Sequence, residues 1–296
     1  MAVSTAYRDN GNLKKVGVSV QYTQEQVEEY VKCSRDPIYF SKYMKIITLD
    51  HGLVPYEMYD FQKDMIRTFN DNRFIISKLG RQSGKTTTSV AFLLWCILFQ
   101  DSYSAAILAN KGQTARDILA RLQLAYENLP IWLQQGIVTW NKSFIELENG
   151  SKIVASSTSS SAARSGSYNL VFLDEFAFVP SSIANEFMQS VYPVITAGTK
   201  TKIIIVSTPN GMNLFYKLWT DAINKRNNYV PFEVHWSQVP GRDDVWEEET
   251  RKNIGDHNFD QEFNCVDGDT IIDIFDKETN EYHTLSIKDF CEWFDS

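Results

Sequence analysis

Short apolar runs alternate with amphipathic stretches through the middle of the chain, and this alternation predicts the fold. The apolar runs are residues 74–77, 104–109, 170–173 and 202–206. Runs of this length that are apolar almost throughout are typical of strands buried on both faces of a parallel sheet. Residues 88–99 and 113–126 carry the longer apolar patterns of helices. The pattern therefore predicts an α/β fold, a mainly parallel sheet with helices on both faces.

A hairpin and an N-terminal helical region complete the predicted elements. Residues 144–148 and 151–155 favour strands, and Asn149-Gly150 between them supplies the positive φ angles of a tight turn. Residues 1–22 are polar without a clear period, which predicts a flexible arm. Thr23 and Gln26 form a capping box that begins a helix to about residue 32, and a second helix is expected over residues 37–47.

A glycine-containing turn joins the first apolar run to the helix that follows it. Its residues are Gly80, Arg81, Gln82, Ser83, Gly84, Lys85 and Thr86. Glycine lets backbone N–H groups turn toward an anion, Lys85 can reach β- and γ-phosphates, and the Thr86 hydroxyl can hold Mg²⁺. The usual spacing places a glycine at position 79, where this chain has Leu79, so an ordinary turn before a helix is the alternative. The strand, loop and helix together predict a P-loop NTPase of the RecA/ASCE-like type.

Two carboxylates follow the third apolar run. Asp174 and Glu175 come directly after residues 170–173, and the carboxyl ends of strands in an open parallel sheet are where ligands bind. We expect Asp174 to hold Mg²⁺ through its waters and Glu175 to polarise the attacking water. An exposed acidic pair at a strand end is the alternative interpretation.

Two further segments add candidate ligand contacts. Ser207 and Thr208 follow the fourth apolar run, where small hydroxyls could bond the γ-phosphate side of the site. An ordinary exit from a strand is the alternative, because Pro-Asn-Gly comes next and forms a turn in either case. Gln62 fits a contact to an adenine base, although a glutamine on a helix face is most often solvated.

Composition and charge narrow the class of protein and its partners. With 296 residues and 43% hydrophobic content, the chain can bury one large core, alone or with a small appendage. Its four cysteines are far apart, so neither a zinc site nor a disulfide framework is predicted. The net charge of −8 confines any DNA contact to a local surface. No signal sequence is present and no apolar stretch reaches the ~20 residues that span a bilayer, so we expect a soluble, non-secreted protein without a membrane partner.

These motifs together resemble the ATPase half of the large terminase subunit of tailed bacteriophages, over residues 23–264. The segments that carry the resemblance are Asp36-Pro37-Ile38-Tyr39-Phe40, Phe61-Gln62, Arg81-Gln82-Ser83-Gly84-Lys85-Thr86, Leu173-Asp174-Glu175-Phe176-Ala177-Phe178 and Ser207-Thr208-Pro209-Asn210-Gly211. The resemblance implies an ATP-driven motor that threads double-stranded DNA into a procapsid through its portal, in the host cytoplasm. It also implies three protein partners: the portal protein, a small terminase subunit and further copies of the chain in a ring.

The resemblance also assigns roles to cationic side chains. The family's loop carries an arginine where Arg81 stands, which implies that Arg81 stabilises charge on the transferring phosphoryl group within the same subunit. Arg164 lies in a family region just before the carboxylate strand and is expected to face nucleotide or DNA. Lys111 and Arg116 are candidate contacts to DNA phosphates, with solvated helix side chains as the alternative.

The chain changes character at Cys265, where the family's ribonuclease H-type nuclease domain would be expected to follow. The run Cys265-Val266-Asp267-Gly268-Asp269-Thr270 resembles the opening block of an intein. That resemblance implies that Cys265 Sγ attacks the carbonyl of Asn264 in an N-to-S acyl shift. Two strands with a turn between them are expected next, and residues 265–296 are too few for a whole splicing domain.

We therefore expect the N-terminal fragment of a split Hint-type intein, and a partner chain that carries the C-intein and the nuclease. A truncated sequence and a buried cysteine in a β-rich extension are the alternatives. The expected organisation is a flexible arm (1–22), a helical region (23–57), the P-loop ATPase core (58–212), a lid or linker (213–264) and the intein fragment (265–296).

Two other functions are consistent with the same motifs. A superfamily-2 helicase also has a glutamine motif, an Asp-Glu strand and a Ser-x-Thr-like segment. Its second RecA lobe could not fit between Asn210 and Cys265, although a partner chain could supply one. A non-catalytic scaffold with a purely structural nucleotide site is the other alternative.

Overall fold

The chain divides into two compact units, Met1–Val234 and His235–Ser296. The computed structural model describes residues 5–159, 166–196, 198–264, 271–276, 279, 281–286 and 289. The boundary between the units differs from the predicted end of the core at residue 212. Strand β12 (Val230–Val234) belongs to the main sheet, at its edge. A proline in this strand, Pro231, weakens its sequence signal but is tolerated at a sheet edge.

An eight-stranded, mostly parallel sheet forms the centre of the first unit, as predicted. Its order is β12-β5-β11-β10-β6-β9-β8-β7. Neighbours are parallel from β12 to β9 and antiparallel from β9 to β7. The remaining bounds are β5 (Phe74–Leu79), β6 (Ser104–Ala109), β7 (Ile137–Trp140), β8 (Phe144–Leu147), β9 (Lys152–Ser157), β10 (Leu170–Asp174) and β11 (Lys202–Ser207). The predicted hairpin is the β8–β9 pair, and Gly150 in its turn has a φ of 78°.

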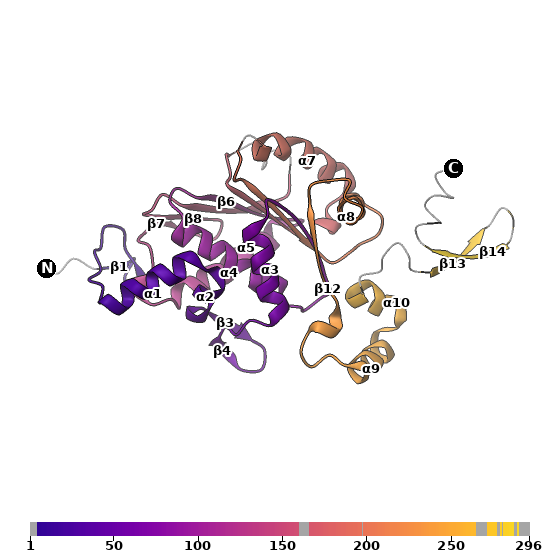
Figure 1. The fold of residues 1–296 in the computed structure, drawn as a ribbon, viewed down its shortest axis with the longest axis horizontal. Coiled ribbons are helices and arrows are strands. Elements are labelled where there is room, and N and C mark those ends of the chain that lie inside the picture. The colour runs from indigo at the N-terminus through magenta and orange to yellow at the C-terminus, as the bar shows by residue number, and fades with distance from the viewer. Residues whose placement is uncertain are drawn as a thin grey trace. The chain divides into compact units, whose positions relative to one another are not determined.

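Helices cover both faces of this sheet, which confirms the predicted class. Figure 1 shows α3, α4 and α5 on one side of the sheet and α7 and α8 on the other. Their bounds are α3 (Asp60–Asp71), α4 (Lys85–Phe99), α5 (Gly112–Glu127), α7 (Ser181–Thr196) and α8 (Leu214–Ile223). Val171 and Leu173 of β10 pack in one cluster with Phe187 of α7 and Phe215 of α8. Among the described residues, no helix has the length and apolarity needed to cross a membrane.

The predicted flexible arm is wrong for the part of residues 1–22 that forms β1 (Ala6–Tyr7) and β2 (Asn10–Lys14). Leu13 and Lys14 are buried. The Lys14 ammonium lies 3.0 Å from Glu148 Oε1, and the Lys14 backbone N–H donates to Gln134 Oε1 at 3.0 Å. A hairpin this short has no extended period, so its attachment depends on partners far along the chain.

The predicted helix over residues 37–47 is also too long. Helix α1 (Gln24–Arg35) begins with the predicted capping box of Thr23 and Gln26, but α2 covers only Pro37–Phe40 and a 3-10 turn ends at Tyr43. An antiparallel hairpin of β3 (Lys45–Thr48) and β4 (Gly52–Pro55) follows. The β-branched run in β3 favours a strand over a helix.

The second unit contains short helices and a hairpin. Helices α9 (Asp244–Ile254) and α10 (Asp256–Phe259) precede a π-helical turn, Asp260–Asn264. Strands β13 (Ile271–Asp276) and β14 (Glu281–Ser286) then pair antiparallel, which confirms the two predicted tail strands. Cys265 lies outside the described residues.

Candidate functional site

The carboxyl ends of three neighbouring parallel strands bring the predicted motifs to one edge of the sheet. Strand β11 pairs with β5 on one side and β10 on the other. In register, Ser207 lies opposite Lys78 of β5, and Asp174 lies opposite Val206 of β11. The predicted phosphate loop (residues 80–84), which follows β5, and the carboxylates at the end of β10 therefore lie on either side of the residues that follow β11. Topology alone brings these segments together from positions far apart in sequence.

The loop between β5 and α4 has the backbone of an anion-binding turn. Gln82 and Gly84 both have left-handed φ angles, 56° and 76°. The Ser83 hydroxyl, buried under the loop, donates to the Gly80 carbonyl at 2.9 Å. The N-cap residue of α4 is Gly84, which has no side chain to bond the N–H groups of the first turn. Those groups and the helix dipole suit a phosphate.

Gln62 of α3 lies against this loop. A β-carbon on Gly84 would clash with Gln62 Nε2, which donates to the Ser83 carbonyl at 3.4 Å. Its Oε1 accepts from the Tyr59 backbone N–H at 3.1 Å and from the Tyr56 hydroxyl at 3.4 Å. The Gln62 amide thus connects helix α3 to the loop. Its contact with adenine stays a prediction.

Sequence reasoning missed the other members of this support. The Tyr56 hydroxyl lies 2.9 Å from Thr88 Oγ1, and the Thr88 hydroxyl donates to the Gly84 carbonyl at 3.0 Å. Tyr56 and Thr88 are both buried. A tyrosine in a loop before a helix gives no local signal of such a role, because its partner is in another helix.

Asp174 is a buried carboxylate at the end of β10, and its Oδ1 has no hydrogen-bond partner among the residues that the structure describes. Burial raises the pKa of Asp174 to about 6. The positive charge of Lys85 lowers this pKa, and the negative charge of Glu175 raises it further. A buried carboxylate oxygen without a partner is costly, and a cation would satisfy it. With the Thr86 hydroxyl in the first turn of α4, the site has oxygen donors of the kind that Mg²⁺ prefers.

The described residues contain no cluster of three or more His, Cys, Asp or Glu side chains that could hold a metal by themselves. Mg²⁺ at a nucleotide site takes most of its ligands from phosphate oxygens and water. One carboxylate and one hydroxyl therefore fit Mg²⁺ that arrives with a nucleotide.

Glu175 follows in an unusual backbone conformation. Its φ and ψ are 52° and 37°, in the left-handed region that a non-glycine residue rarely adopts. A 3-10 turn, Phe176–Phe178, begins directly after it, and the Phe178 N–H donates to the Glu175 carbonyl at 3.0 Å. Such a conformation persists only where the surroundings hold it, and it is common at catalytic positions.

Ser207 and Thr208 are buried at the exit of β11. The Ser207 hydroxyl donates to the Thr208 carbonyl at 2.7 Å and accepts from the Ala177 N–H at 3.1 Å. Its single hydrogen is therefore used within the chain, and a bond to a γ-phosphate would require the hydroxyl to turn. The predicted phosphate contacts of both residues stay predictions.

The cationic candidates occupy different places. Arg81 is exposed on the phosphate loop and Lys111 is exposed just before α5. The Arg116 guanidinium donates to Gln113 Oε1 at 2.9 Å. Arg164 lies outside the described residues.

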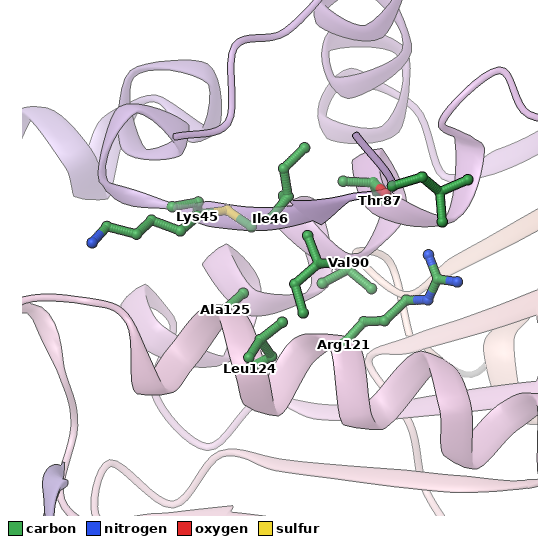
Figure 2. A pocket seen from close by; sticks show the side chains of 10 residues that line it. Lys45, Ile46, Thr87, Val90, Arg121, Leu124 and Ala125 are labelled. Carbon is green, nitrogen blue, oxygen red and sulfur yellow. The ribbon is translucent and has the colours of Figure 1, made fainter. Parts of the chain in front are cut away.

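A further arginine, which sequence reasoning did not select, lines a cavity of about 320 Å³ between β3 and helices α4 and α5. Figure 2 shows Arg121 of α5 extending toward Thr87 in the first turn of α4, with Lys45 at the other end of the cavity. The positive charge of Arg121 is among those that favour ionised Asp174. Arg121 is far from residues 80–86 in sequence, so no local pattern indicates that it lies near the first turn of α4.

One protein family and several solved structures are similar to this chain. Residues 76–279 match the family described as "Terminase large subunit, T4likevirus-type, N-terminal", and this match continues past Cys265. The ATPase domain of the Thermus phage P74-26 large terminase has 20% sequence identity and a TM-score of 0.57, with 71% of this chain and 94% of that chain covered. The HK97 bacteriophage large terminase has 18% identity and a TM-score of 0.64, with 83% and 57% covered.

The large terminase of a thermophilic bacteriophage, solved in complex with ADP, has 12% identity and a TM-score of 0.56, with 71% of this chain and 53% of that chain covered. At these identities the likeness shows a shared fold. This chain spans little more than half the length of the HK97 protein and of the ADP-bound protein.

Proposed function

This chain belongs to the family of T4likevirus-type terminase large subunits, of which it carries the N-terminal region, and we propose that it hydrolyses ATP to drive double-stranded DNA into a procapsid. One observation carries the proposal. Three features lie at the same edge of the sheet: the phosphate loop with Lys85, the Asp174 carboxylate, and Glu175 in its constrained turn. The Asp174 Oδ1 has no hydrogen-bond partner among the described residues. The three features are the set of groups that phosphoryl transfer to water requires.

Each residue has a definite role in the proposed reaction. The loop N–H groups from Gly80 to Gly84 and the Lys85 ammonium hold the β- and γ-phosphates. Thr86 would hold Mg²⁺ directly and Asp174 through water, and the ion when bound neutralises charge on the phosphates. Glu175 accepts a proton from water as the water oxygen attacks the γ-phosphorus and the bond from that phosphorus to the β–γ bridging oxygen breaks.

Arg81 supplies positive charge toward the transferring phosphoryl group from the same subunit. Arg81→Lys keeps the charge but loses the planar fork of donors. We expect this variant to bind nucleotide nearly as well as the wild type and to turn it over more slowly. Equal turnover would remove Arg81 from the proposed mechanism.

ATP turnover by the whole chain tests the core of the proposal. Glu175→Gln and Lys85→Ala should each reduce turnover by about a hundredfold or more. Glu249→Gln is a matched control, because Glu249 is an exposed glutamate of α9 in the other unit. Negligible turnover by the wild type and the Glu175→Gln variant alike would favour a non-catalytic scaffold instead.

The proposed partners are double-stranded DNA, the portal protein, a small terminase subunit and further copies of the chain in a ring on the portal, in the host cytoplasm. The family membership supports them. The net charge of −8 restricts any DNA contact to a local surface. Stimulation of ATP turnover by portal protein or small subunit is the expected result, whereas stimulation by single-stranded DNA alone would favour a helicase.

A second proposal concerns the tail, where we propose an N-terminal split-intein fragment from Cys265 onward. The β13–β14 hairpin directly after the Cys-x-x-Gly-Asp-Thr run supports it. The Asn264 side chain accepts from Trp236 Nε1 at 2.7 Å and donates to Asp260 Oδ1 at 2.6 Å, so the residue before the splicing cysteine is held at both ends of its amide.

The chemistry of the tail is an acyl shift. Cys265 Sγ attacks the Asn264 carbonyl carbon, the amide C–N bond breaks, and the amine of Cys265 takes the thiol proton as a thioester forms. The test mixes this chain with a chain that carries a C-intein and a nuclease. Mass spectrometry should find Asn264 joined to the partner's first residue after the intein, and Cys265→Ala should give no product. Absence of ligation with the unsubstituted chain would remove this proposal and leave the ATPase proposal intact.

A further inference from the structure

We propose that Asn213, at the start of α8, is a positioning residue for Glu175. It acts through the peptide groups of Ala177, two residues after the proposed general base. The inference rests on the proposed ATPase function. It assigns a role to a residue that none of the sequence motifs singled out.

The amide of Asn213 makes three contacts that divide cleanly between its two ends. Its Nδ2 donates to the Ala177 carbonyl at 2.6 Å and to the Asn210 carbonyl at 2.9 Å. Its Oδ1 accepts from the Tyr216 N–H at 3.2 Å and so caps helix α8. The Asn213 side-chain nitrogen therefore binds the turn that follows Glu175, and the side-chain oxygen caps helix α8.

The backbone N–H of Ala177 is also bound, by the end of strand β11. Its N–H donates to the Ser207 hydroxyl at 3.1 Å, at the last residue of β11. Asn210 adds a longer contact to the Ala177 carbonyl, at 3.4 Å. Both the N–H and the carbonyl of this buried residue are thus held by the segment that joins β11 to α8.

The turn that contains Ala177 also constrains the backbone of Glu175. Glu175 has a left-handed backbone, and the 3-10 turn that begins after it contains Ala177. A residue in that region relaxes toward ordinary backbone angles unless its neighbours prevent it. Phe176, almost fully buried, fixes the turn on the core side. Ser207 and Asn213 fix it on the side of the β11 exit, so loss of the Asn213 donor should misdirect the carboxylate without emptying the phosphate loop.

Asn213→Asp separates the two functions of the side chain. Aspartate keeps the oxygen that caps α8 and is itself a favourable residue at a helix N-terminus. It loses the donor to Ala177 and places a carboxylate beside two carbonyl oxygens. Asn224→Asp is the matched control, because Asn224 donates to the Thr220 carbonyl at 2.9 Å at the opposite end of the same helix.

The measurements are kcat and KM for ATP, the affinity for a non-hydrolysable ATP analogue, and the thermal unfolding midpoint of the full chain. We expect Asn213→Asp to lower kcat about tenfold or more, with analogue affinity within about twofold and an unfolding midpoint close to that of the wild type. Asn224→Asp should leave kcat unchanged. A kcat of Asn213→Asp equal to that of the wild type would overturn the inference, and so would a fall in kcat matched by loss of analogue binding and of stability.

A double-mutant cycle with Ser207→Ala tests whether both residues act through Ala177. If they do, the double variant should be little slower than the slower single variant, because the turn is already released. Strictly additive losses in log kcat would overturn the shared route. A wild type without ATP turnover would instead remove the proposed function and this inference with it, which keeps the two failures distinguishable.

Discussion

The side-chain nitrogen of Gln62 occupies the space that a β-carbon on Gly84 would need. The loop and helix α3 are thus packed so closely that a β-carbon at Gly84 would displace the end of the buried Gln62 side chain. Gly84 also has a φ of 76°. Two independent physical demands, space and backbone conformation, therefore converge on one residue.

Gly84→Ala should destabilise the protein and abolish nucleotide binding. The left-handed backbone alone costs about 1 kcal/mol for alanine, and the clash with Gln62 adds to this cost. Gly52→Ala is the matched control, because Gly52 has a φ of 66° with nothing within 4 Å of its added carbon. Thermal unfolding should show a larger loss for Gly84→Ala than for Gly52→Ala, and the loss from Gly84→Ala should be smaller when it is made in a chain that already carries Gln62→Ala. Equal losses at the two glycines would contradict the steric argument.

Asp174→Asn should stabilise the protein at neutral pH. Burial, as the largest cause, raises the pKa of Asp174 from 3.8 to about 6. Between these values the folded protein binds more protons than the unfolded chain, so through this group stability falls as pH rises from about 4 to about 6 and is level above that. This rise in pKa corresponds to about 3 kcal/mol. Urea unfolding of both proteins should show a difference that is small near pH 4 and full at pH 7, and a difference independent of pH would contradict the assignment.

The same titration should act on turnover in the opposite direction. Asp174 must be ionised to hold Mg²⁺, so ATP turnover by the wild type should rise as pH increases through about 6. High Mg²⁺ concentration should shift this limb to lower pH, because the ion competes with the proton for the same carboxylate. If the pH at which turnover rises does not change with Mg²⁺ concentration, a group other than Asp174 causes the rise.

Lys14→Ala should lower stability by about 1–2 kcal/mol, because it leaves the partly buried carboxylate of Glu148 without its cation. Lys15→Ala is the matched control, since Lys15 is the adjacent residue and is exposed. Urea unfolding of both variants distinguishes an attached hairpin from a flexible arm. If the two variants are equally stable, the N-terminal hairpin contributes nothing through Lys14.

Tyr56→Phe should weaken nucleotide binding several-fold and also lower the free energy of unfolding. It removes the hydroxyl that lies 2.9 Å from Thr88 Oγ1 and reaches Gln62, at a cost of about 1 kcal/mol. Isothermal titration with an ATP analogue measures the effect. Unchanged affinity would show that the loop keeps its shape without this support.

The local signals in the sequence were sufficient for the main elements of the fold. The apolar run that ends at Asp174, the glycine turn before Lys85 and the Asn149-Gly150 hairpin all depend on residues within a few positions of each other, and the structure has each element where it was expected. Local reasoning failed where a partner lies far away. Residues 1–22 were expected to be flexible because Glu148 cannot be connected to Lys14 from spacing alone.

By itself, the sequence determined the class of fold, the elements that carry the phosphate loop and the carboxylates, and the family. Those features follow from periodicity and from short motifs, which depend on backbone preferences and nearest neighbours. Only the tertiary structure decided that β11 lies between the two motif strands, that Gln62 lies against Gly84, and that Ser207 and Asn213 hold both sides of Ala177. These are contacts between segments far apart in the chain, and they form because strand order and helix packing bring them together.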